Sequence, residues 1–97
     1  MKLEISDIVL SRNGRDAGKR FFIVGLDECE YALLADGKFR RMEKPKRKKQ
    51  KHLKLEARGT GDRAAVKLRS GDKVTNSELR KAIAEYGAAR AAEKGGV

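Results

Sequence analysis

The fold is decided by the stretch Arg12-Asn13-Gly14-Arg15-Asp16-Ala17-Gly18-Lys19-Arg20-Phe21-Phe22-Ile23-Val24-Gly25, where a basic loop punctuated by glycine runs directly into an apolar segment. Glycine adopts a positive φ without steric cost, so Gly14 and Gly18 predict a tight loop over residues 13–18. Residues 20–26 are aromatic and β-branched in their middle, which is typical of a strand. The basic side chains of the loop are therefore expected at the end of a rigid element.

The composition predicts one small domain with a polyanionic partner. The chain has 97 residues, of which 39% are apolar and none is Trp, so its core must be thin. Its formal charge of +10 indicates nucleic acid, an acidic membrane surface or an acidic protein as partner. Ten of the 24 Lys and Arg residues fall in residues 38–54, beside a single acid, Glu43. The positive field is therefore local.

Further strands are predicted on both sides of the central one. Residues 3–10 alternate loosely between apolar and polar and are expected to form the first strand, and residues 31–35 the third. Asp36-Gly37 predicts a type I′ hairpin turn, which needs a positive φ at both residues and leads into a fourth strand over residues 38–42. Residues 53–57 alternate again and are expected to close a five-stranded barrel by pairing beside the first strand.

Residues 44–51 form a basic run with one proline and no apolar side chain. Like charges at this density repel one another, so the run is predicted to be extended and mobile until a polyanion binds. Pro45 has no amide N–H to give to a ladder, which predicts that the fourth strand ends by Glu43. The predicted barrel thus spans residues 1–57 and includes the basic segment, which we define as residues 44–52.

A short helix is predicted near the C-terminus, after a linker over residues 58–74 in which residues 64–68 are compatible with a short strand or one helical turn. Thr75 and Glu78 have the spacing of a capping box at the start of this helix. Its apolar face consists of Leu79, Ala82, Ile83 and Tyr86. Gly87 predicts its end, so that residues 75–97 comprise a short amphipathic helix and a frayed tail.

The glycine-bracketed loop resembles a KOW motif, and other segments resemble one subfamily in the same order: the KOW-domain RNA-binding proteins similar to the fourteenth large-subunit ribosomal protein of archaea and eukaryotes. The resemblance covers roughly residues 3–56. The segments that carry it are 6–11, 14–19, 35–40, 43–49 and 51–53. It implies an SH3-like barrel that binds structured RNA, above all large-subunit ribosomal RNA, with ribosomal proteins as further partners and a role in translation or ribosome assembly.

The resemblance and the charge distribution together define a candidate RNA-binding surface. Arg15 and Lys19 are expected to contact phosphates or to stack on splayed bases, while Gly14 and Gly18 let the backbone approach the RNA. The lysines of the basic run are expected to contribute affinity rather than base recognition. The predicted contacts come from Arg12, Arg15, Lys19, Arg20, Lys38, Arg40, Arg41, Lys44, Lys46, Arg47, Lys48, Lys49, Lys51 and His52.

Catalysis is not predicted, because the sequence shows no nucleophile with a matching base and no carboxylate pair supported by histidine. Cys29 is the single cysteine and His52 the single histidine, so no disulfide, metal site or cofactor is expected. No apolar stretch approaches the ~20 residues of a membrane helix. We therefore expect a cytoplasmic protein with no membrane partner and no small-molecule substrate.

Several alternatives remain open on the sequence. A KOW module can instead act as a protein-interaction domain in transcription or translation elongation, in which case the face with Leu79 and Tyr86 is a docking surface rather than part of the core. DNA is a third possible partner, because phosphate contacts do not distinguish it from RNA. By composition alone, the loop is also compatible with an ordinary solvated hairpin. Phe22 and Phe39 are expected in the core, because few aromatic residues are available to fill it.

Overall fold

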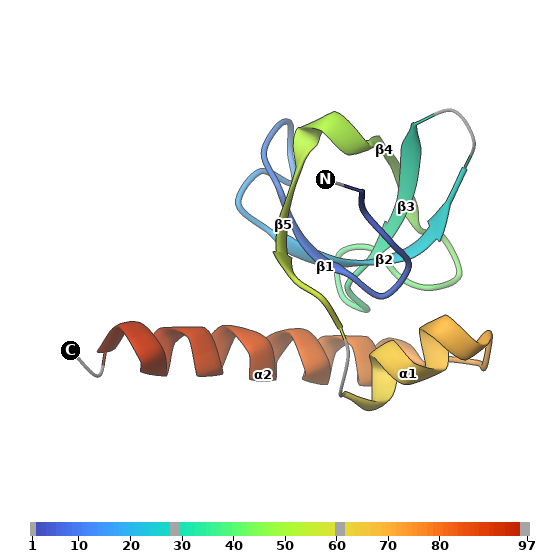
Figure 1. Cartoon of the computed structure of the whole chain (residues 1–97). Helices are drawn as coiled ribbons and strands as arrows, with labels where there is room; N and C mark the ends of the chain where they lie inside the picture. The colour runs from blue at the N-terminus through green and yellow to red at the C-terminus, as the bar shows by residue number, and fades with distance from the viewer. Residues whose placement is uncertain (1, 28–29, 60–61, 96–97) are drawn as a thin grey trace.

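The structure is a computed structural model, which describes residues 2–27, 30–59 and 62–95. A five-stranded antiparallel sheet with the strand order β4-β3-β2-β1-β5 is followed by two helices that lie against one side of it (Figure 1). The elements are β1 (Ile8–Ser11), β2 (Arg20–Leu26), β3 (Tyr31–Ala35), β4 (Lys46–Lys49), the 3-10 turn η1 (Gln50–His52), β5 (Leu53–Ala57), α1 (Arg63–Ser70) and α2 (Asn76–Gly95).

Strand β2 is buried on both of its faces. Phe21 and Ile23 belong to a first core, around which the sheet curls, together with Val9 and Leu34. Phe22 belongs to a second core, which lies between the sheet and the two helices. Successive side chains of a strand point to opposite faces, so the continuous apolar run of β2 fills the two cores alternately.

The predicted strands at residues 20–26, 31–35 and 53–57 are confirmed, and β5 pairs with β1 as expected. The first strand is shorter than predicted, because it begins at Ile8. Ser6 has a φ of +79°, and the carboxylate of Asp7 accepts the backbone N–H of Glu4 at 2.8 Å. This turn prevents a continuous strand from residue 3.

The predicted fourth strand over residues 38–42 is wrong. The Oδ1 atom of Asp36 accepts the backbone N–H groups of Lys38 and Arg40, each at 2.9 Å, so these donors are not available to a ladder. The type I′ turn is also wrong, because Gly37 has a positive φ and Asp36 does not. Residues 36–45 instead form a long β3–β4 connection.

The fourth strand is the basic run itself, which we had predicted to be mobile. In β4, Lys46 pairs with Leu34 and Lys49 with Tyr31. Lysine is well tolerated on an edge strand, because its long stem covers apolar neighbours while the ammonium group stays in water. Alternation along the strand also sends successive charges to opposite faces, which lowers their repulsion.

The predicted closure of the barrel is not found among the described strands. The sheet is open, with β4 and β5 as its two edges. The chain passes from β4 to β5 through η1, which lies at the end of the sheet that points away from α2 (Figure 1).

The C-terminal segment is more helical than predicted. Helix α1 occupies the middle of the expected linker. The capping box of α2 is confirmed, since the Thr75 N–H donates to Glu78 Oε1 at 3.0 Å and the Glu78 N–H donates to Thr75 Oγ1 at 3.2 Å. Hydrogen bonds from Lys67 and Thr75 lower the pKa of Glu78 to about 2. Gly87 does not end the helix, because the cost of one glycine, ~1 kcal/mol, is outweighed by the alanine-rich sequence around it.

The apolar face of α2 packs against the sheet. Leu79 is completely buried in the second core, and Ile83 and Tyr86 pack against the same core. Phe22 is buried as expected, whereas the prediction that Phe39 lies in the core is wrong, because 54% of its surface is exposed. In the described part of the chain, no helix is long and apolar enough to cross a membrane.

The start of α2 is fixed to the β3–β4 connection. Asn76 Oδ1 accepts the backbone N–H of Met42 at 2.7 Å, and Arg80 Nη1 donates to the carbonyl oxygen of Gly37 at 2.6 Å. Gly37 lies so close to the helix that a Cβ atom there would be 2.1 Å from the carbonyl oxygen of Asn76. Helix α2 is therefore an integral part of the domain.

This contact predicts different costs for two glycine substitutions. Gly71 also has a positive φ, but a Cβ atom there would meet no atom within 4 Å. Gly71→Ala should therefore lower the free energy of unfolding by the left-handed penalty alone, about 1–2 kcal/mol. Gly37→Ala should cost a further ~1–3 kcal/mol, because it forces α2 away from the connection. Urea unfolding measures both, and equal losses would contradict this docking.

Candidate nucleic-acid interface

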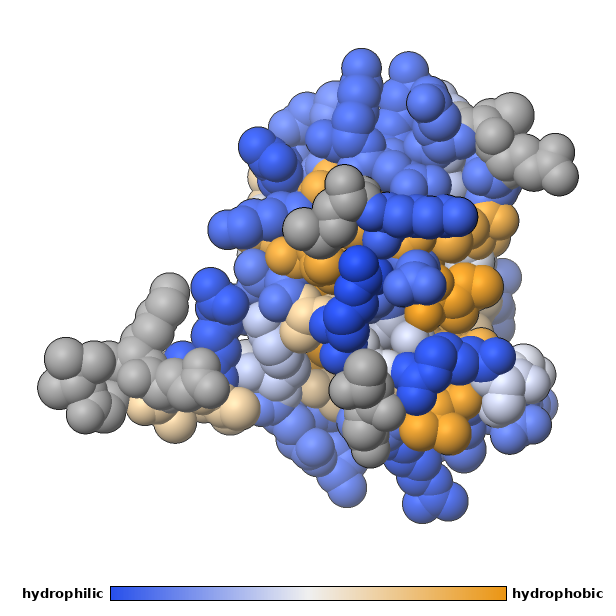
Figure 2. Space-filling model, in the orientation of Figure 1, coloured by the Kyte–Doolittle hydropathy of each residue, from blue (hydrophilic) through white to orange (hydrophobic). Residues whose placement is uncertain are grey.

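The basic segment lies at the end of the sheet opposite α2. Strand β4 and η1 form this end in Figure 1, and Figure 2 shows that hydrophilic side chains cover it. Here the β1–β2 loop, which we define as residues 12–19, approaches β4. Two elements far apart in the sequence thus meet at one surface.

The β1–β2 loop has the tight geometry that its glycines predicted. Gly14 and Gly18 have φ values of +78° and +85°. Backbone hydrogen bonds close the loop: Ser11 donates to Lys19, Gly18 to Ser11, Ala17 to Gly14 and Lys19 to Asp16. A Cβ atom on Gly18 would meet no atom within 4 Å, so a ligand can approach the backbone there.

A half-buried ion pair ties this loop to the β3–β4 connection. Arg40 Nη2 lies 2.9 Å from Asp16 Oδ2, and the carboxylate of Asp16 is almost fully buried. Arg40 Nε donates to the same oxygen at 3.2 Å. Arg40, predicted to contact RNA, is therefore engaged in holding the loop in place.

Lys48 ties the loop to the edge strand. Its ammonium group donates to the hydroxyl of Ser11 at 2.6 Å and to the backbone carbonyl of Asn13. Beside this contact lies a hollow of about 260 Å³, which the backbone at Gly14 lines together with Arg15 and Lys46. The structure thus brings residues of both predicted basic elements into one site.

Two further arginines of the predicted surface are engaged within the protein. Arg47 Nε lies 2.9 Å from Asp27 Oδ2, and its guanidinium group lies 3.6 Å from the centre of the Tyr31 ring. Arg20 Nε donates to Glu56 Oε1 at 2.9 Å. Burial raises the pKa of Glu56, but the hydrogen bond from Arg20 and the positive charges of Arg90 and Arg20 outweigh it, so the pKa lies below its usual value. These arginines are held by partners that an RNA would have to replace.

Two weaker contacts involve Arg41 and His52. Arg41 pairs with Glu43 at 3.1 Å, and both side chains are more than 60% exposed, so solvent screens the pair. His52 Nδ1 lies 2.8 Å from Asn13 Nδ2, which connects η1 to the β1–β2 loop. Both residues remain at the surface of the candidate site.

The other predicted cations carry their charge into solvent. Within the described residues, none of them makes an ion pair or a side-chain hydrogen bond. They are Arg12, Arg15, Lys19, Lys38, Lys44, Lys46, Lys49 and Lys51. Lys19 and Lys38 lie against the ring of Phe39, and Lys49 lies 5.9 Å from the centre of the Tyr31 ring. The other five cations can meet phosphate groups without breaking a contact that the described structure shows.

Phe39 is the surface residue that the sequence placed wrongly. It lies in the β3–β4 connection, with Lys19 Nζ 3.8 Å and Lys38 Nζ 5.1 Å from the centre of its ring. Phe39 follows a turn and stands between Lys38 and Arg40, and this position favours exposure. The wrong prediction of a strand over residues 38–42 led us to expect it in the core. Cys29 lies outside the described residues, and within them no group of three or more His, Cys, Asp or Glu side chains is placed to hold a metal ion.

Comparison of the chain with protein-family models and with curated proteins finds no match.

The contacts of Lys48 generate a test against its neighbour Lys49, whose side chain makes no hydrogen bond in the described structure. Lys48→Met removes the ammonium group that holds the β1–β2 loop, at a cost of roughly 1 kcal/mol in local stability. Amide hydrogens of residues 12–19 should then exchange about fivefold faster. Lys49→Met removes the same charge and should leave these amides unchanged. Equal effects in a hydrogen-exchange experiment would contradict a structural role for Lys48.

Proposed function

We propose that this protein is a non-catalytic RNA-binding protein of the KOW type, which binds ribosomal RNA as a ribosomal or ribosome-associated protein. The observation that carries the proposal is the shared hollow where Arg15 and Gly14 of the loop meet Lys46 of the basic edge strand. A rigid loop that offers an arginine and open backbone, beside exposed lysines, suits a folded polyanion.

The strand arrangement supports the finer proposal of an SH3-like barrel. Strands β1 to β4 form an antiparallel meander, and β5 pairs antiparallel with β1 at the opposite edge of the sheet from β4. A single 3-10 turn carries the chain from β4 to β5. We propose that the curled sheet is a partly open barrel of this type, in keeping with the resemblance to KOW domains.

The division of the cations suggests how binding works. Arg15 is held on a loop fixed by the Asp16–Arg40 pair, so it loses little conformational entropy on binding. Lys44, Lys46 and Lys49 are exposed, and a lysine carries its charge on a flexible four-carbon stem, so they contribute through neutralisation of phosphates and release of counterions. The loop therefore provides geometry, and the lysines provide affinity that depends on salt.

The alternative of a protein-interaction module receives less support. That function would use the apolar face of α2 as a docking surface, but Leu79 is buried and Ile83 packs against the second core. We also propose a reducing compartment such as the cytoplasm for this protein. Ribosomal proteins bound to the same RNA would then be its neighbours. A competition experiment between RNA and DNA distinguishes RNA binding from DNA binding.

Two charge-matched double variants test the electrostatic part of the proposal. Lys46→Ala with Lys49→Ala removes two charges from the basic segment, and Lys73→Ala with Lys81→Ala removes two exposed charges near α2. The first variant should flatten the plot of log K against log salt by up to about 1.4, since each lost contact with single-stranded RNA contributes about 0.7. The second should leave the slope unchanged. If the two variants have equal slopes, the RNA does not bind at the basic segment, and this part of the proposal is wrong.

Sedimentation tests the ribosomal part. In a lysate at low salt, the protein should move with the large ribosomal subunit, because several phosphate contacts hold it there. It should be released as salt rises, and the variant lacking Lys46 and Lys49 should be released at lower salt than the variant lacking Lys73 and Lys81. A protein that stays in the top fractions at low salt would refute the ribosomal assignment.

A further inference from the structure

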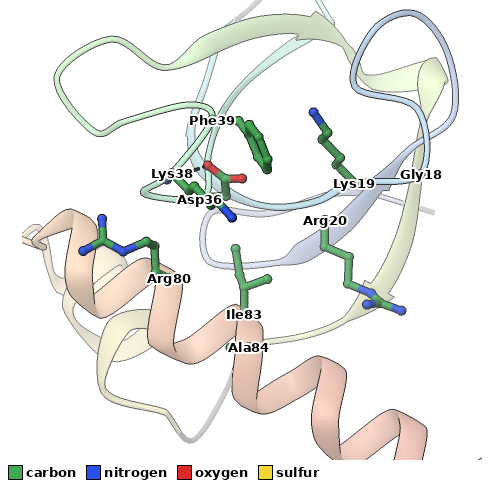
Figure 3. Close-up of a pocket in the computed structure, with 9 residues that line it drawn as sticks. All are labelled: Gly18, Lys19, Arg20, Asp36, Lys38, Phe39, Arg80, Ile83 and Ala84. Carbon is green, nitrogen blue, oxygen red and sulfur yellow. Dashed lines mark hydrogen bonds between the residues drawn. The ribbon is translucent and has the colours of Figure 1, made fainter.

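A second hollow, which we call the Phe39 pocket, lies on the side of the molecule where α2 crosses beneath the sheet (Figure 3). Its volume is about 380 Å³, at the lower end of the ~300–1,000 Å³ of small-molecule sites. Three segments surround it: the end of the β1–β2 loop, the β3–β4 connection and the middle of α2. The pocket therefore combines the predicted RNA-binding elements with a helix outside the region of resemblance.

The floor of the pocket is apolar. Ile83 and Ala84 of α2 line it, together with the side chains of Arg20 and Arg80. In Figure 3 the guanidinium groups of both arginines point away from the centre of the pocket. They are engaged with Glu56 and with the carbonyl oxygen of Gly37, so the arginines offer their stems to the pocket.

Phe39 forms the opposite wall, and more than half of the residue is exposed. An exposed phenyl ring contributes little to folding, because most of its apolar surface stays in water. The ammonium group of Lys19 lies 3.8 Å from the ring centre, which is a cation–π contact. A ring kept at the surface between two lysines is available as a stacking platform.

The polar groups of the pocket limit what it can hold. Lys19 and Lys38 favour an anion, whereas the carboxylate of Asp36 accepts hydrogen bonds and repels a bare anion. Asp36 is buried and its Oδ1 already accepts the backbone N–H groups of Lys38 and Arg40, so its carboxylate acts mainly through its charge. A nucleotide suits the two lysines and the ring, because its phosphate meets the lysines and its base presents a flat face to Phe39. An apolar peptide segment would leave both lysines without an anionic partner.

The pocket is also continuous with the basic segment. Phe39 borders a neighbouring hollow of about 520 Å³, which Arg41, Lys44 and Lys46 line as well. A strand of RNA that follows these cations therefore arrives at the ring of Phe39. Glu43 also lines this hollow and pairs with Arg41, but the basic side chains outnumber it, so the lining keeps a net positive charge.

We propose that the Phe39 pocket receives one unstacked nucleotide of the bound RNA, with its base on the ring of Phe39 and its phosphate on Lys19 and Lys38. Lys19 leaves the ring face for the phosphate when the base arrives. This inference rests on the proposed RNA-binding function and deepens it. A continuous duplex offers no unstacked base, so the pocket selects RNA with loops, bulges or free ends.

Phe39→Ala tests the proposal on two RNA probes with equal numbers of phosphates: a hairpin with an unpaired loop and a blunt duplex. Loss of one stacked base should weaken binding of the hairpin by roughly 5- to 140-fold and leave duplex binding unchanged. Phe39→Trp should retain hairpin binding. Val66→Ala, at another exposed apolar residue on α1, is the matched control and should change neither.

Tryptophan fluorescence gives an independent readout, because the chain contains no Trp. In the Phe39→Trp variant, the hairpin should quench the emission when a base stacks on the indole ring, and the duplex should not. A Val66→Trp variant should show no quenching with either RNA. This measurement reports contact at position 39 even where affinity changes little.

The outcomes separate this inference from the proposed function. If the wild-type protein binds neither RNA, the proposed function fails and the pocket assignment fails with it. If it binds RNA but Phe39→Ala weakens the hairpin and the duplex equally or not at all, the RNA-binding function stands and the nucleotide pocket is refuted. Quenching of the Phe39→Trp variant by poly-glutamate but not by the hairpin would also refute it, in favour of an acidic peptide.

Discussion

The burial of β2 on both faces is the constraint on which the rest of the structure depends. Phe21 and Ile23 need the curled sheet to cover them, and Phe22 needs a layer on the other side. The five strands provide the first cover, and α1 and α2 provide the second (Figure 1). A sheet of this size with one face in water would expose much of its apolar surface, so the helices complete the domain rather than extend it.

This two-sided burial fixes the candidate interface as well. The β1–β2 loop leads directly into β2, so the loop inherits the rigidity of the most deeply buried strand. Asp16 and Lys48 then hold the loop to its neighbours through an ion pair and hydrogen bonds. Part of the positive charge is thereby used within the protein, and the remainder faces solvent. The net charge alone does not reveal this division.

The edge strand β4 shows how one segment can meet two demands. Its backbone completes the sheet by pairing with β3, while its side chains keep a high positive charge at the surface. An edge of lysines also discourages pairing with another sheet, because like charges would face one another. A basic edge is therefore compatible with stability, and it leaves the charge available to a polyanion.

The sequence by itself determined the local features: the glycine loop, the strands β2, β3 and β5, the capping box of Thr75 and Glu78, and the helical face of Leu79. Each follows from residue types within a few positions, where propensity and periodicity apply. The tertiary structure alone decided the rest. Asp36 accepts the backbone N–H groups of Lys38 and Arg40, so no strand forms there; the fourth strand lies in the basic run instead, and Phe39 is exposed. Arg40 and Lys48 became structural because their partners, Asp16 and Asn13, are distant in sequence and near in space. A sequence pattern describes residues that are close along the chain. It therefore does not predict contacts between distant residues, which only folding brings together.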